Sequence, residues 1–238
     1  MQELCSRSVW IHVELPGQGV NTSELSSEYP SLQALSDSLA DILNQLHTTY
    51  VIGFGEGAGA NILIRFAMSY PDQVLGLFLI HPIVTSAGFQ ERYKGKFQLN
   101  RAPVNRKNLQ MLVEAFHERN NLQPMLKEKL RCDTMLVVGD NSPFHDSVQE
   151  MHSHSNVLKC SILAVDNVNE PLSEAPEKVA RALLLFCQGL GILSSVSTVE
   201  RSRSSSSVSS NGIGRRLSMQ ELDRPRKISI RQHQDEVV

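Results

Sequence analysis

Long apolar runs are missing from this sequence of 238 residues. No stretch approaches the roughly 18 consecutive apolar residues that a membrane-spanning helix needs. The first five residues, Met1-Gln2-Glu3-Leu4-Cys5, lack the basic flank and the apolar stretch of a secretory signal peptide. We therefore expect a cytoplasmic protein.

An excess of charge of one sign is also missing, because 23 Lys and Arg residues stand against 25 Asp and Glu residues, a formal net charge of -2. Aromatic residues make up only 5% of the chain, and no basic stripe is interleaved with them. Such a chain creates no overall field that attracts nucleic acid and offers no platform on which bases could stack. Nucleic acid is not an expected partner.

Cysteine is scarce as well, and the spacing of the four residues fits neither a zinc site nor a disulfide framework. They are Cys5, Cys132, Cys160 and Cys187. We expect reduced and mostly buried thiols.

Three histidines, His145, His152 and His154, lie close together in the sequence, but no cysteine or carboxylate set completes a metal site. We predict that these histidines are solvated. The sequence predicts no metal and no cofactor.

The apolar residues that are present alternate between two periods. Strand patterns occupy residues 8–15, 50–54, 74–80, 134–139 and 157–164, and helical patterns occupy residues 31–46, 58–70, 109–117 and 173–189. Strands that alternate with helices predict a parallel α/β sheet flanked by helices.

The composition changes after Gly191, where serine with scattered arginine replaces the apolar pattern. Such a segment buries too little apolar surface to offset the conformational entropy lost on ordering. We predict an α/β domain over residues 1–192, with a polar and irregular region at 83–131, and a disordered Ser/Arg-rich tail at 193–238.

A glycine-rich turn follows the strand predicted at 50–54. In α/β hydrolases a buried strand runs into G-x-S-x-G and then into a helix, so that the serine nucleophile lies on a strained turn. Here Gly53-Phe54-Gly55-Glu56-Gly57 has this spacing, and Gly55 occupies the nucleophile position. The predicted nucleophile position has no side chain.

The acid and the base of a hydrolase triad follow later strands. In this sequence Ser142 occupies the acid position after the strand at 134–139, and Asn169 occupies the histidine position after the last strand. Asparagine cannot act as a general base near neutral pH. These degenerate positions predict that the protein is not an enzyme. A hydrolase with a displaced nucleophile stays as an alternative, although neither Ser86 nor Cys132 lies on a strand-to-helix turn.

The same glycines also fit G-x-G-x-x-A, from Gly53 to Ala58, which is a dinucleotide-binding pattern. That pattern expects an acidic residue at the end of the next strand, whereas here the strand ends with Ile80-His81-Pro82. Glu56 would also place a carboxylate near a bound pyrophosphate. A nucleotide-binding α/β protein is therefore a weaker alternative.

Several ordered blocks of the sequence resemble the N-myc downstream-regulated (NDRG) family. They span roughly residues 8 to 193 and include residues 51–60, 65–67, 71–77, 136–143 and 186–191. The resemblance implies an α/β-hydrolase fold without hydrolase activity, acting in cytoplasmic signal transduction or in stress and differentiation responses. It also implies that the first strands of the family precede this start and that the cap region at 83–131 is shortened, as expected of a truncated member or isoform or an incomplete gene model.

The tail carries basic residues two and three positions before a serine in two places. These are Arg215-Arg216-Leu217-Ser218 and Arg226-Lys227-Ile228-Ser229, and Arg201-Ser202-Arg203 precedes Ser204. Basophilic Ser/Thr kinases bind such segments because acidic groups in their clefts pair with the upstream guanidinium groups. We predict phosphorylation at these three serines. The charge change would alter contact with protein partners or with an anionic membrane surface.

Overall fold

The structure is a computed structural model that describes residues 5–88 and 105–193. The chain divides into two units, Met1–Ser197 and Thr198–Val238, and all described residues belong to the first. The predicted phosphorylation sites Ser204, Ser218 and Ser229, and the predicted disorder of residues 194–238, lie outside the described residues.

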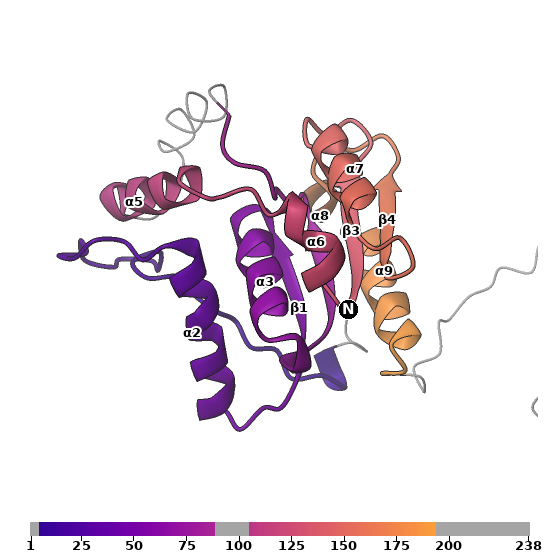
Figure 1. Ribbon diagram of the computed structural model, residues 1–238, viewed down its shortest axis with the longest axis horizontal. Helices are drawn as coiled ribbons and strands as arrows, with labels where there is room; N and C mark the ends of the chain where they lie inside the picture. The colour runs from indigo at the N-terminus through magenta and orange to yellow at the C-terminus, as the bar shows by residue number, and fades with distance from the viewer. Residues whose placement is uncertain (1–4, 89–104, 194–238) are drawn as a thin grey trace, which may run out of the picture. The chain divides into compact units, whose positions relative to one another are not determined.

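Four parallel strands form the sheet of the described unit. They are β1 (Val51–Glu56), β2 (Val74–Ile80), β3 (Asp133–Gly139) and β4 (Cys160–Val165), and they lie side by side in the order of the chain. Each connection therefore moves one strand along the sheet in the same direction. This arrangement confirms the predicted parallel α/β sheet (Figure 1).

Helices connect and cover these strands. They are α2 (Leu32–Gln45), α3 (Gly57–Ser69), the 3-10 helix η1 (Pro71–Gln73), α5 (Arg106–His117), α6 (Gln123–Lys129), α7 (His145–His154), α8 (Pro171–Glu174) and α9 (Pro176–Gly189). Helix α2 begins where predicted, because the hydroxyl of Ser31 accepts a hydrogen bond from the N–H of Ala34 and caps the helix.

The sheet buries both of its faces, and alternate residues of β2 point into different cores. Leu77 and Leu79 pack with residues of α3, α6 and α7. Phe78 and Ile80 pack on the opposite face with residues of α9. A parallel strand covered on both sides needs apolar residues at every position, which explains the continuous apolar run of β2.

The strand predicted at residues 8–15 is wrong, because the structure assigns no strand there. The apolar side chains that suggested it, Val9, Ile11 and Val13, are exposed. A strand needs a neighbour for its backbone N–H and C=O groups, and no described strand pairs with the outer edge of β1. Alternation in a sequence predicts an extended conformation, but it does not supply the partner.

The helix predicted at residues 173–189 is divided into α8 and α9. The break falls at Ala175, which has φ -138 and ψ 51, because Pro176 disfavours the helical conformation of the residue before it. Helix α6 was not predicted, since its seven residues are too few for a clear apolar period. In the described ranges, no helix is long and apolar enough to cross a membrane.

The four cysteines are free thiols, and their exposure differs. Cys160 and Cys187 are buried, Cys132 is partly buried and Cys5 is exposed. Burial raises the pKa of Cys132 and of Cys160 to about 11, and it also raises the pKa of Cys187.

Candidate functional site

The junction between β1 and α3 corrects the predicted nucleophile position from Gly55 to Gly57. Gly55 lies inside β1, paired with Leu79, and a Cβ there would lie 2.7 Å from Leu63 Cδ1. Gly57 begins α3 with a positive φ of +52, and a Cβ there would meet no atom within 4 Å. The nucleophile of an α/β hydrolase is the strained, outward residue of this turn. The corrected position is also a glycine.

A signal for this correction was present in the sequence. Gly55-Glu56-Gly57-Ala58-Gly59 has the G-x-S-x-G spacing too, two residues later than the first match. Because glycine recurs at every second position, the sequence fits both alignments of the hydrolase turn equally well. Only the backbone conformation distinguishes them.

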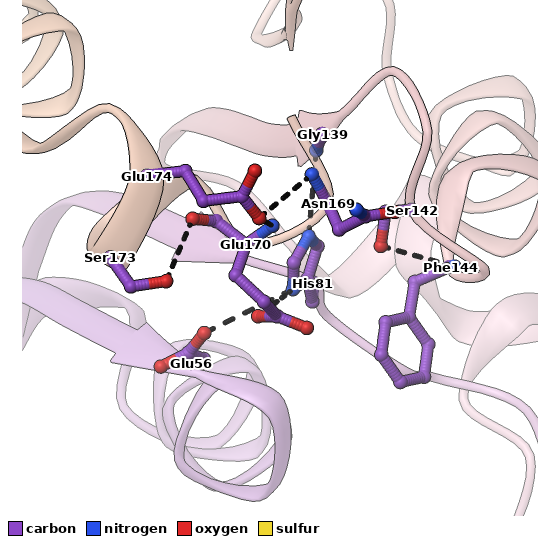
Figure 2. Close-up of polar contacts among 9 residues, drawn as sticks. All are labelled: Glu56, His81, Gly139, Ser142, Phe144, Asn169, Glu170, Ser173 and Glu174. Carbon is purple, nitrogen blue, oxygen red and sulfur yellow. Dashed lines mark hydrogen bonds and ion pairs between the residues drawn. The ribbon is translucent and has the colours of Figure 1, made fainter. Parts of the chain in front are cut away.

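Ser142 and Asn169 lie at the same edge of the sheet, beyond the carboxyl ends of β3 and β4 (Figure 2). Ser142 is buried, and its hydroxyl accepts a long hydrogen bond of 3.4 Å from the N–H of Phe144. The N–H of Asn169 donates to Glu174 Oε1 at 3.1 Å. Both residues thus make local contacts that organise their loops, and neither offers the carboxylate or imidazole of a triad.

A histidine that the sequence analysis did not single out as a site residue lies at the centre of this edge. His81 follows β2 directly, adopts a positive φ of 46 and is only 3% exposed. Its Nδ1 lies 3.6 Å from Glu170 Oε2 and 3.9 Å from Glu56 Oε1 (Figure 2). Glu56 is the last residue of β1, His81 follows β2, and Glu170 lies in the loop after β4. Because these strands are parallel, their carboxyl ends meet at one edge of the sheet and bring the three residues together.

The contacts of His81 indicate which ring nitrogen carries the proton. The backbone N–H of Gly139 points to Nε2 at 3.4 Å, so Nε2 is the acceptor and a neutral ring carries its proton on Nδ1. That N–H faces the two carboxylates. The ring also lies 5.3 Å from the ring of Phe144. His81 therefore acts as a neutral bridge between the ends of β1, β3 and the loop after β4.

The ligand atoms of Glu56, His81 and Glu170 lie within 4.8 Å of one another, a spacing that a metal ion could bridge. A metal-bound histidine, however, donates its second ring N–H to an acceptor. Here the second nitrogen faces a donor, the N–H of Gly139. The orientation of the ring therefore favours a metal-free bridge.

Burial and the neighbouring carboxylates shift two pKa values at this site. Burial lowers the pKa of His81, and the charge of Glu170 partly opposes that change. Burial raises the pKa of Glu56, and the charge of Glu170 raises it further. Glu170 thus raises both pKa values, although for opposite physical reasons, attraction to an imidazolium and repulsion of a second carboxylate.

Replacing Glu170 with glutamine should lower the pKa of both His81 and Glu56. NMR titration of the two side chains measures this, with Asp166→Asn, an exposed change in the same loop, as the control. Because the pKa of His81 in the folded state lies below its ordinary value of 6.5, folding stability falls as the pH drops below that value. The fall should be larger in Glu170→Gln. A His81 midpoint that stays in place or rises would contradict the assigned role of Glu170.

The described unit has the α/β-hydrolase fold. A carboxylesterase of Nitrososphaera gargenis superposes with a TM-score of 0.62 at 15% identity, covering 75% of this chain and 79% of the esterase. MenH of Staphylococcus aureus superposes with a TM-score of 0.61 at 13% identity, covering 75% of this chain and 83% of MenH. Identities this low establish the shared fold alone.

The sequence defines the family within that fold. The family model of the Ndr family matches residues 1–103 and 98–194, and the chain belongs to this family. Protein NDRG2 of Mus musculus is 31% identical over 253 residues, which cover 90% of this chain and 68% of NDRG2. The protein ZK1073.1 of Caenorhabditis elegans is 33% identical over 269 residues, covering 98% of this chain and 80% of that protein. The family predicted from the ordered sequence blocks is confirmed.

Proposed function

We propose that this protein is a non-catalytic member of the α/β-hydrolase fold that acts in cytoplasmic signalling or in stress and differentiation responses. One observation carries the proposal: the turn that presents the nucleophile in hydrolases holds Gly57, whose backbone has the strained conformation but which has no side chain. Without a nucleophile, acyl transfer at this turn cannot begin.

The contacts of His81 support the same proposal over a hydrolase with a displaced nucleophile. In the part of the chain that the structure describes, its polar contacts are Glu56, Glu170 and backbone groups, and no serine or cysteine side chain is among them. Activation of a hydroxyl or thiol requires such a side chain within reach of the base. Among the described residues, neither Ser86 nor Cys132 forms a hydrogen bond to a histidine, and Cys132 Sγ lies 4.0 Å from Thr134 Oγ1 instead.

The strand order speaks against the nucleotide-binding alternative. Dinucleotides bind where the strand order of a doubly wound sheet reverses, and the described strands follow one another without a reversal. The carboxylate of Glu56, directly before the start of α3, would also repel a pyrophosphate at that helix end.

The catalytic part of the proposal is tested with the full chain, p-nitrophenyl esters and a fluorophosphonate probe that labels activated serines. We expect hydrolysis at the buffer rate and no labelling. A Gly57→Ser variant is the informative comparison, because it restores a hydroxyl but not the missing base at Asn169, and it should also stay inactive. Turnover by the wild-type chain, with a labelled serine, would replace the proposal with a displaced-nucleophile hydrolase.

The regulatory part of the proposal concerns the tail, in which Ser204, Ser218 and Ser229 follow basic residues. Phosphate adds about -1.5 to -2 charges at pH 7 and would nearly cancel the local positive charge. We propose that a basophilic kinase phosphorylates these serines and that protein partners bind according to the modification.

Phosphopeptide mass spectrometry on protein isolated from cells should find phosphate at Ser218 and Ser229. A variant with both serines changed to alanine should lose or gain specific partners in a pulldown relative to wild type. Ser209→Ala, in the same tail but without a basic residue two or three positions before it, is the matched control. An unmodified tail together with unchanged partners would remove the tail from the proposal.

A further inference from the structure

A cleft lies away from the Glu56–His81–Glu170 edge, near the amino ends of β2 and β3. It has a volume of about 420 Å³, and residues of α2, α3 and α6 line it. The lining includes three cationic side chains, Arg65, Lys129 and Arg131, and it includes no aspartate or glutamate. A cleft of this size is large enough for a small organic ligand.

Arg65 forms the buried part of this cationic set. Its side chain comes from α3 and is only 4% exposed, and its three hydrogen bonds all go to neutral amide oxygens. Nε donates to Asn61 at 2.8 Å, Nη2 donates to Asn120 at 2.7 Å and Nη1 donates to Gln33 at 3.5 Å. The guanidinium is therefore held in place, but within the described part of the chain no acidic group pairs with its charge.

Burial of a cation without a counter-ion is costly, because the group leaves water and gains no compensating attraction. The lowered pKa of Arg65, which is due first to burial, agrees with this uncompensated environment. The amide oxygens of Asn61, Asn120 and Gln33 orient the guanidinium fork, which has five N–H donors, and three hydrogen bonds leave donors available for a ligand.

Lys129 and Arg131 are exposed and add two more cationic side chains to the lining of the cleft. In residues 5–88 and 105–193, no carboxylate lies within 4.0 Å of the charged groups of Arg65, Lys129 or Arg131. Asp37 reaches the cluster only through Gln33, whose Nε2 donates to Asp37 Oδ1 at 3.0 Å. The cleft is thus cationic at its base and at its rim.

We propose that this cleft binds a phosphate monoester, with the phosphate on Arg65 between Lys129 and Arg131. A dianionic phosphate matches several cations better than a single carboxylate does, and its oxygens accept paired hydrogen bonds from a guanidinium fork. The apolar side chains of Met68 and Met125 also line the cleft and would contact an uncharged part of the ligand. The phosphate can come from a soluble metabolite or from a lipid headgroup, and the test separates the two.

The first arm of the test titrates phenyl phosphate into the full chain by isothermal calorimetry at low salt. Lys129→Ala and Arg131→Ala change exposed side chains, so the fold should stay intact. Each should weaken binding about tenfold or more, because each removes one charge-assisted hydrogen bond to the phosphate. Lys127→Ala is the matched control, because Lys127 is exposed on the same helix but does not line the cleft. It should bind like wild type.

The second arm measures binding to phosphatidylcholine vesicles that contain phosphatidic acid, a lipid phosphate monoester, against vesicles with the same charge from phosphatidylserine. Binding of phenyl phosphate alone identifies a soluble ligand. Preference for phosphatidic acid that depends on Lys129 and Arg131 identifies a lipid headgroup. The proposal is overturned if neither probe binds, or if the Lys127→Ala control weakens binding as much as the two cleft variants do.

Discussion

Alanine in place of Gly139 should lower the free energy of unfolding by roughly 3 kcal/mol or more. The added Cβ would lie 2.4 Å from the carbonyl oxygen of Val168 and 2.6 Å from that of Asn169. Both are backbone atoms, and the loop cannot simply retreat. The N–H of Asp140 donates to Val165 O and the N–H of Asn141 donates to Val168 O, each at 3.0 Å.

Urea unfolding monitored by circular dichroism measures this change. Gly59→Ala is the control, because a Cβ there meets no atom within 4 Å and the residue lies inside α3. Alanine in a helix should stabilise the protein by about 0.5–1 kcal/mol relative to glycine. Equal stabilities for Gly139→Ala and wild type would mean that the loop after β4 lies farther from β3 than the structure places it.

Truncating Phe78 to alanine should destabilise the protein by about 3–5 kcal/mol. Phe78 is fully buried in the middle of β2, and its ring lies 5.7 Å from the ring of Phe54 and 6.0 Å from that of Phe186. Its loss therefore leaves a cavity between the sheet and α9 and removes two aromatic contacts as well.

Phe54→Ala provides the comparison for this variant. Phe54 neighbours the same ring but is 36% exposed, so its truncation removes less buried surface and should cost clearly less. Thermal unfolding of the two variants shows which truncation lowers the stability more. If Phe54→Ala were the more damaging change, the α9 face of the sheet would not be the core that the structure describes.

The parts of the fold that a local pattern specifies could be predicted from the sequence. Residues 74–80 form β2 because an unbroken apolar run suits a strand covered on both faces, and residues 32–45 form α2 because leucine recurs at helical spacing after a Ser31 cap. The strand prediction for residues 8–15 was wrong for a non-local reason. Its pattern fits a strand, yet pairing depends on a neighbouring strand that a local pattern does not contain.

The candidate site was only partly predictable, for two physical reasons. The alternating glycines around Glu56 allow two alignments of the hydrolase turn, and the choice between Gly55 and Gly57 depends on which residue has a positive φ. His81 and Glu170 follow different strands, so that their approach depends on the order of strands in the sheet. The amides around Arg65 come from α2, from α3 itself and from the loop between α5 and α6, and they carry no shared motif.

The unequal exposure of the cysteines has a practical consequence for attaching a reporter group. Thiol-directed reagents react with the thiolate, and a pKa of about 11 leaves almost no thiolate on Cys132 or Cys160 at neutral pH. Cys187 is buried as well, whereas Cys5 is open to solvent. A maleimide dye should therefore attach to Cys5 alone in the native protein, which provides a single fluorescent label for the binding measurements without any substitution in the chain.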